Sequence, residues 1–215
     1  MERHALLTEI AERIQRIDCA HPLRVAIDGI DGAGKTHFAD ELAPLLDDER
    51  QIIRASVDGF HRPRAERYRR GRLSPEGYYR DAFDYPGLIR HLLVPLGPGG
   101  TRWFRVHIFD HRRDVEDLSP EDVARDDAIL LLDGVFLQRE ELEDLVDYRI
   151  HLKVDRREAL SRAAERDPES PESPDDALNR RYIGAHAMYF AACDPETNAD
   201  TLILNQPLDD PTLLR

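Results

Sequence analysis

The chain has 215 residues, a length that suits one domain or one domain with a small appendage. Hydrophobic residues make up 41% and charged residues 34%, which argues against a disordered chain. The formal net charge of −13 opposes nonspecific binding to nucleic acid or to an anionic membrane. No apolar run approaches the ~20 residues of a membrane span, and the charged N-terminal segment lacks a signal-peptide core. We therefore expect a cytoplasmic protein without nucleic-acid or membrane partners, whose two cysteines are reduced.

Apolar spacing, glycine and proline divide the chain into alternating helices and strands. We expect helices at 3–18, 35–46, 88–93, 138–146, 156–166 and 178–191, and strands at 23–27, 51–57, 102–109, 128–132, 148–154 and 201–204. This alternation predicts an α/β fold with a mostly parallel five-stranded sheet flanked by helices. No interdomain linker is visible, so we expect one domain over 1–215. It contains an irregular segment at 58–83 and a lid loop at 167–180 that includes the sequence DPESPESPDD.

Residues 29–36, GIDGAGKT, match the pattern G-x-x-x-x-G-K-[ST] of a P-loop. An apolar strand precedes the match and a helix follows it, as phosphate binding by backbone N–H groups and a helix N-terminus requires. We expect Lys35, one of only two lysines in the chain, to reach the terminal phosphates of ATP and assist catalysis. The predicted contacts to ATP in this segment are Gly29, Asp31, Gly32, Ala33, Gly34, Lys35, Thr36 and His37.

Two aspartates follow predicted strands at positions where a P-loop enzyme needs carboxylates. Thr36 would supply a hydroxyl to Mg²⁺, and Asp133, at the end of the apolar run AILLL, fits the second metal-side position. Asp58 follows the strand 51–57, where a carboxylate would face the P-loop crevice and accept the proton of an attacking hydroxyl. Either aspartate could instead serve only a helix cap or a turn. A guanine-reading N-K-x-D motif is absent, and the length favours a small-molecule kinase.

Several segments occur in an order that resembles the uridine kinase family, within the wider group of uridine kinase, phosphoribulokinase and pantothenate kinase. They are VAIDGIDGAGKT, SVDGFHRPRAERY, FDYP, LLLDGVFL, LSRAAERD and CDPETNADTLILN, between about residues 23 and 205. The resemblance implies that Asp58 is the catalytic base, that Asp84 holds the ribose hydroxyls, and that Thr36 and Asp133 lie on the magnesium side. The arginines that it places on the ATP phosphates or in a closing lid are Arg162, Arg166, Arg180 and Arg181.

The same resemblance implies an acceptor site, for which the expected contacts are Asp58, Phe60, His61, Asp84, Phe109, His111 and Arg181. Phe109 stands where the family often has tyrosine, and Ala163 stands where it often has a second arginine. We expect ATP-dependent transfer to the 5′-hydroxyl of uridine or cytidine, with Arg166 neutralising developing charge. Pantothenate, a nicotinamide riboside, a sugar or a specialised nucleoside are alternative acceptors, and a non-catalytic nucleotide-binding regulator is the rival from another class. The sequence leaves the oligomeric state, including a homo-oligomer, open.

The segment 62–72, RPRAERYRRGR, holds six arginines in eleven residues. It could bind nucleic acid, recruit an anionic substrate or pair with acidic side chains of its own chain. Nucleic acid is the weakest of the three, because Tyr68 is the only stacking residue nearby. We therefore expect an acceptor-side flap over 58–83. The neighbouring SPEGYY resembles a segment of pantothenate kinase, which keeps an acidic or phosphorylated acceptor open.

Overall fold

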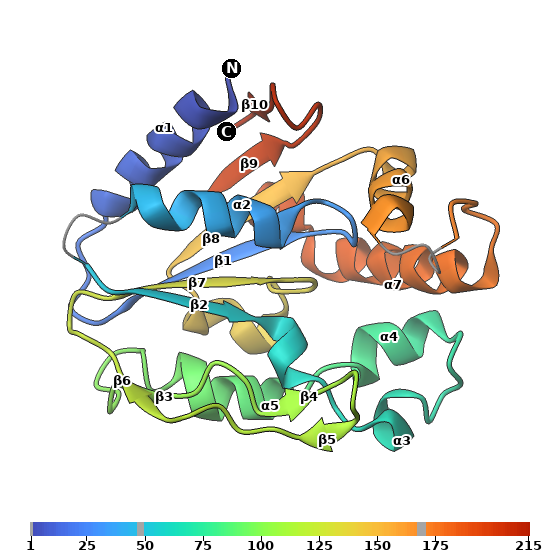
Figure 1. Ribbon diagram of the computed structural model, residues 1–215, viewed down its shortest axis with the longest axis horizontal. Helices are drawn as coiled ribbons and strands as arrows, with labels where there is room; N and C mark the ends of the chain where they lie inside the picture. Colours follow the sequence, from blue (N-terminus) through green and yellow to red (C-terminus); the bar gives the residue numbers. More distant parts are fainter. Residues whose placement is uncertain (1, 47–49, 167–170) are drawn as a thin grey trace.

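The computed structural model describes residues 2–46, 50–166 and 171–215, and within them the chain forms three layers around one sheet (Figure 1). The six strands of that sheet lie in the order β10-β9-β8-β1-β7-β2. Their bounds are β1 Leu23–Gly29, β2 Ile52–Ser56, β7 Ile129–Gly134, β8 Tyr148–Lys153, β9 Thr201–Leu204 and β10 Thr212–Leu213. All neighbours pair in parallel except β10, which is antiparallel to β9. The predicted fold class is confirmed, with β10 as a strand beyond the five expected.

Helices cover both faces of the sheet because its central strands are apolar on both faces. Residues of β1 and β7 alternate between two buried clusters, so that Val25 and Leu131 face one layer while Ala26 and Leu132 face the other. The first layer holds α1 Arg3–Gln15, α2 Lys35–Leu42 and η1 Ala43–Leu45. The second holds α4 Pro75–Asp81, α5 Tyr85–Leu88, η3 Ile89–Leu93, η4 Glu140–Leu145 and α7 Ala177–Cys193.

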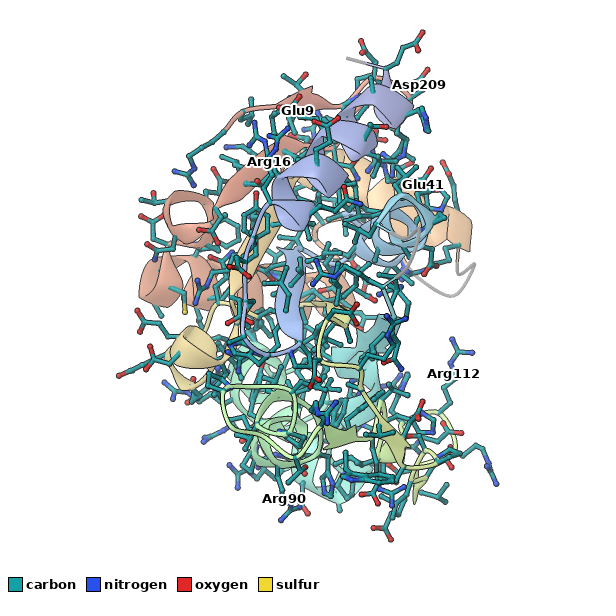
Figure 2. The ribbon with its side chains drawn as sticks, turned by 90° about the vertical axis from the view of Figure 1, so that its left-hand side faces the viewer. Glu9, Arg16, Glu41, Arg90, Arg112 and Asp209 are labelled. Atoms are coloured by element: carbon teal, nitrogen blue, oxygen red, sulfur yellow. The ribbon has the colours of Figure 1, made fainter. Side chains whose placement is uncertain are left out.

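The N-terminal helix α1 illustrates how the sequence pattern sets the packing. Leu6, Ile10 and Ile14 recur at helical spacing and are buried against the first layer. Glu9 and Arg16 lie on the outer side of the helix (Figure 2). Within the part of the chain that the structure describes, no helix is both long and apolar enough to cross a bilayer.

The predicted strand at 102–109 is wrong. The structure instead has β3 Trp103–Phe104, which pairs with β6 Asp122–Val123, and β4 Phe109–Asp110, which pairs with β5 Val115–Glu116. Both are short antiparallel pairs outside the main sheet. The segment carries Arg102, Arg105 and His107, side chains that a strand covered on both faces could not bury.

The segment 58–83 is more ordered than predicted. It contains η2 Val57–Phe60, α3 Arg64–Arg67 and α4. Helix α4 begins where Ser74 accepts a hydrogen bond from the Gly77 amide at 3.0 Å and Pro75 occupies the first helical position. Its two tyrosines, Tyr78 and Tyr79, are buried. This burial explains why a polar, arginine-rich segment nevertheless forms a helix.

The remaining helices differ from prediction mainly in their type and bounds. The helix expected at 88–93 is α5 followed by the π-helical turn η3, and the one expected at 138–146 is the 3₁₀-helix η4. The two helices not yet described are α6 Arg156–Arg166 and α8 Pro195–Asn198. The predicted lid loop at 167–180 lies outside the described residues at 167–170. It ends in the first turn of α7, where Asp176 caps the Leu178 amide at 2.8 Å.

Shortening a central side chain should weaken the whole domain. Leu131 of β7 is fully buried, so Leu131→Ala should lower the free energy of unfolding by about 2–5 kcal/mol through lost burial and a cavity. Leu73→Ala, at a side chain that is 51% exposed, should change it by about 0.5 kcal/mol or less. Urea unfolding of both variants tests this. Equal losses would contradict the packing described here.

Candidate functional site

The turn between β1 and α2 has the backbone of a phosphate-binding loop. Gly32 and Gly34 adopt φ angles of +80° and +87°, values that favour glycine. A Cβ on Gly32 would collide with the backbone carbonyl of Ala159 in α6, so this helix lies directly against the loop. Helix α2 starts at Lys35, and its N-terminus therefore opens into the loop.

Contacts from distant parts of the chain support this loop. The buried Asn205, just after β9, donates through Nδ2 to the Ala33 carbonyl at 2.8 Å. Arg3 of α1 donates to Asn205 Oδ1 at 2.9 Å, which orients the amide. Lys35 Nζ donates to the Ile30 carbonyl at 2.8 Å and so lies across the loop. The ammonium is thereby placed where a terminal phosphate would compete for it.

Thr36 and Asp133 meet at the carboxyl edge of the sheet, as predicted. Thr36 Oγ1 donates to Asp133 Oδ2 at 2.7 Å, and Asp133 is almost fully buried at the end of β7. Arg54 of β2 donates to Asp133 Oδ1 at 3.1 Å and compensates the buried charge. A hydroxyl and a carboxylate side by side are the hard oxygen donors that suit Mg²⁺. The pair thus fits the magnesium side of a nucleotide site.

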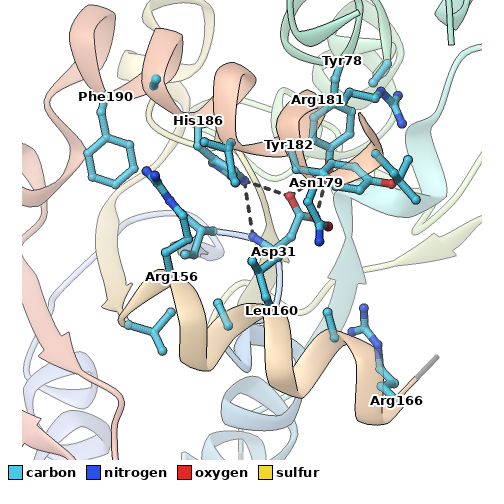
Figure 3. A pocket seen from close by; sticks show the side chains of 18 of the residues that line it. Asp31, Tyr78, Arg156, Leu160, Arg166, Asn179, Arg181, Tyr182, His186 and Phe190 are labelled. Carbon is cyan, nitrogen blue, oxygen red and sulfur yellow. Dashed lines mark hydrogen bonds and ion pairs between the residues drawn. The ribbon is translucent and has the colours of Figure 1, made fainter. Parts of the chain in front are cut away.

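Asp31, in the middle of the loop, is tied to α7 and α4. His186 Nε2 lies 2.8 Å from Asp31 Oδ2, and the Tyr78 hydroxyl donates to Asp31 Oδ1 at 3.1 Å (Figure 3). Burial alone would raise the pKa of Asp31. The hydrogen bond from His186, its electrostatic attraction and that of Lys35 outweigh burial and lower this pKa to about 2. Asp31 is therefore an ionised link between the loop and two helices that cover it.

A cavity of about 980 Å³ lies beside the loop, between α6, α7 and the segment 58–83. The predicted site residues on its wall are Asp31, Asp58, His61, His111, Arg166 and Arg181. Figure 3 shows Arg156 and Arg166 on α6, below Asp31, while Arg181 lies on the opposite side with Tyr78 and Tyr182. The structure thus brings residues from five separate parts of the sequence to one space.

Asp58, the predicted base, is well exposed, with 62% of its side chain accessible. Its backbone amide donates to Ser56 Oγ at 3.3 Å, and its carbonyl lies 2.9 Å from His61 Nδ1. The His61 ring stacks on His111 with centroids 4.4 Å apart, and burial lowers the pKa of His61. These contacts fix the turn after β2, and Asp58 forms part of the cavity wall.

Other predicted site residues lie outside the cavity wall. Asp84 caps α5, where its Oδ1 accepts from the Gly87 amide at 3.1 Å. Phe60 is buried in the core, and Phe109 lies in β4. His37 faces Glu41 on the surface of α2. Arg162 pairs with Glu158 and donates to the Asn205 carbonyl.

Three of the six arginines of 62–72 contact acidic side chains of their own chain. Arg69 and Arg70 both bind the buried carboxylate of Asp81, and Arg67 lies 3.3 Å from Asp114. Of the interpretations considered from the sequence, pairing within the chain is the one observed for these three. Arg67 and Tyr68 also line the cavity, so this part of the segment contributes to its wall.

A second set of residues around the loop was not predicted as functional. Asp28, fully buried at the end of β1, accepts from the Tyr189 hydroxyl at 2.6 Å and lies 3.1 Å from His151 Nδ1. Burial would raise the pKa of Asp28, but His151 and Tyr189 lower it overall. Together with His186 and Asn205, these residues hold the base of the loop. The sequence indicated this set only through Asp28, an aspartate that directly follows the apolar run VAI of β1.

The pairing of Asp31 with His186 can be tested by carboxyl ¹³C NMR. Because the folded-state pKa is lowered, the stability that ionised Asp31 contributes is present above about pH 3.8 and is lost as pH falls towards 2. Asp31 should therefore stay ionised down to about pH 3, and in His186→Gln its midpoint should rise, because the hydrogen bond and the attraction of His186 no longer oppose the effect of burial. The exposed His4→Gln serves as the control and should leave the midpoint unchanged. A midpoint near 3.8 in the unmodified protein would contradict the pairing.

Comparison with known proteins agrees with this geometry, although no protein-family model matches the chain. A uridine kinase of Lactobacillus helveticus (strain DPC 4571) is 25% identical over 176 residues, which are 81% of this chain and 82% of that protein. Among solved structures, a possible uridine kinase from Bacillus stearothermophilus has a TM-score of 0.74 at 22% identity, covering 94% of this chain and 99% of that one. A protein of Silicibacter sp. TM1040 named as a fructose transport system kinase has a TM-score of 0.67 at 25% identity, covering 90% and 96%. Over most of its length the chain is thus similar to proteins named uridine kinase, and it shares their P-loop kinase fold.

Proposed function

We propose that the protein transfers the γ-phosphate of ATP, in the presence of Mg²⁺, to a hydroxyl group of a small molecule. One observation carries the proposal. Ser56 of β2 lies opposite Asp133 of β7, and Asp58 follows two residues later on the wall of the cavity. A carboxylate that can accept a proton therefore lies next to the Thr36–Asp133 pair that suits a metal-bound triphosphate.

Each residue has a role that follows from its chemistry. The loop backbone and Lys35 bind the phosphates, and Thr36 and Asp133 would hold Mg²⁺, which neutralises phosphate charge when bound. Asp58 takes the proton of the acceptor hydroxyl as its oxygen forms a bond to the γ-phosphorus. The bond between that phosphorus and the β–γ bridging oxygen breaks, and ADP leaves. Arg166, on the cavity wall, is placed to neutralise charge and exclude water.

The names of the curated relatives suggest uridine as the acceptor, and the expectation from the sequence is transfer to the 5′-hydroxyl of uridine or cytidine. The aromatic wall residues Tyr68, Tyr78 and Tyr182 offer ring surfaces to such a ligand. Asp84 and Phe109, two of the contacts expected for a nucleoside, lie off the cavity wall. Pantothenate, a nicotinamide riboside, a sugar and a specialised nucleoside are therefore retained as alternative acceptors. A regulator that binds ATP without turnover is the second candidate function, and the exposed Asp58 carboxylate argues against it.

The kinase proposal is tested by ADP release with Mg²⁺–ATP against uridine, cytidine, other nucleosides, pantothenate and simple sugars. Asp58→Asn should lower kcat on the active acceptor by about 100-fold or more while ATP affinity is retained, because the proton acceptor is lost. Lys35→Ala should lower both turnover and ATP affinity. The exposed Asp126→Asn is a matched control and should behave as the unmodified protein. Near-normal turnover in Asp58→Asn would reject its role, and tight ATP binding without turnover on any acceptor would favour a regulator.

A further inference from the structure

Arg181 is a buried cation on the cavity wall whose guanidinium is incompletely satisfied. The residue is 6% exposed, and its Nε has no hydrogen-bond partner among the described residues. The guanidinium lies over three tyrosine rings, with centroid distances of 5.5 Å to Tyr68, 4.6 Å to Tyr78 and 5.2 Å to Tyr182. None of the carboxylates in the described part of the chain lies within ion-pair distance of it.

Such a placement is costly unless something compensates the charge. Burying a cation away from water is strongly unfavourable, and contacts with tyrosine rings offset only part of the cost. An orphaned donor in a buried guanidinium therefore calls for a partner that approaches from the cavity. A carboxylate or a phosphate suits the planar fork of arginine, because its two oxygens can accept parallel N–H bonds.

The carboxylates nearest to this pocket have other partners. Asp31 is linked to Arg181 through the shared Tyr78 ring, but its oxygens accept from His186 and Tyr78. Arg67 also lies over the Tyr68 ring, 5.3 Å from its centroid, and pairs with Asp114. Among the described residues, no carboxylate thus pairs directly with the Arg181 guanidinium.

This cation lies on the acceptor side of the cavity. A chain of contacts runs from Arg181 over Tyr68 to Arg67, whose Nη2 donates to the His111 carbonyl at 3.0 Å. His111 stacks on His61, and His61 contacts the Asp58 carbonyl. Arg156 and Arg166, at the two ends of α6, also line the cavity and lie on the far side of Asp31 from Arg181 (Figure 3). The loop backbone and the arginines of α6 can bind the phosphates of ATP. Arg181 is therefore available to bind the acceptor.

We propose that the acceptor is a small hydroxylated molecule that carries an anionic group, a carboxylate or a phosphate, and that Arg181 binds this group. The inference rests on the proposed kinase function and narrows its substrate class. The anion would contact the tyrosine-lined pocket at Arg181 while a hydroxyl of the same molecule reaches Asp58. Arg181 is then a specificity-determining residue, since a neutral nucleoside would leave its charge without a counterion.

The test measures binding and does not require turnover. The protein is loaded with Mg²⁺ and a non-hydrolysable ATP analogue, so that the P-loop is occupied. Calorimetry then compares glycerol with D-glycerate, ribose with ribose 5-phosphate, and pantetheine with pantothenate, with uridine as a further neutral probe. D-glycerate and pantothenate test a carboxylate, and ribose 5-phosphate tests a phosphate, so the comparison shows which anion is preferred. We expect the anionic member of at least one pair to bind about 10-fold tighter or more than its neutral partner and than uridine.

Three variants assign that preference to Arg181. Arg181→Gln should abolish it, and Arg181→Lys should retain part of it, because lysine keeps the charge but lacks the planar fork. Arg113→Gln, at an exposed arginine beside Asp110, should leave it intact. If Arg181→Gln does not fold, the Arg181→Lys comparison still decides, since a preference equal to that of the unmodified protein would reject the role.

The outcomes separate this inference from the proposed function. The inference about Arg181 would be overturned if the neutral member bound as tightly as or more tightly than the anionic one in every pair. It would also be overturned if the anion preference survived Arg181→Gln. Both results would count against it even if a neutral acceptor is phosphorylated. An anion preference that depends on Arg181, without ADP release on any acceptor once ATP is supplied, would instead support the binding site while rejecting the kinase proposal.

Discussion

The parallel register of β2, β7 and β1 is the constraint on which the site depends. It places Asp133 opposite both Ile27 and Ser56, so the carboxyl ends of the three strands coincide. From that edge the chain enters the P-loop motif after β1 and reaches Asp58 after β2, and near the end of β7 it carries Asp133 beside Thr36. A slip of one residue in this pairing would turn Asp133 to the opposite face and separate it from Thr36. The apolar faces that bury β7 on both sides make such a slip costly.

A second level of organisation joins the loop to the helices around it. The backbone of α6 lies against Gly32, and His186 of α7 binds Asp31. Tyr78 of α4 contacts both Asp31 and Arg181, so the loop and the Arg181 side of the cavity share one tyrosine. A change in the position of α7 would therefore alter both the contacts of the loop with His186 and the surroundings of Arg181. The cavity is built from contacts between helices as much as from the sheet.

The sequence predicted the parts of this site that are local. A P-loop is read from eight consecutive residues, and Asp58 and Asp133 from their positions at strand ends. The contacts that complete the site connect residues far apart in the chain, such as Asp31 and His186, which are separated by 155 positions. No spacing rule reports such a pair. Likewise Tyr78 forms part of a helix because its ring is buried, although the surrounding composition is typical of an irregular segment.

The most direct test of the central claim is a crystal structure of the protein with Mg²⁺ and a non-hydrolysable ATP analogue. The account predicts that the terminal phosphate displaces Lys35 from the Ile30 carbonyl, that Thr36 and Asp133 lie on the metal side, and that Asp58 faces the γ-phosphate across the cavity. A nucleotide bound elsewhere, or a γ-phosphate that Asp58 cannot approach through an acceptor hydroxyl, would contradict it.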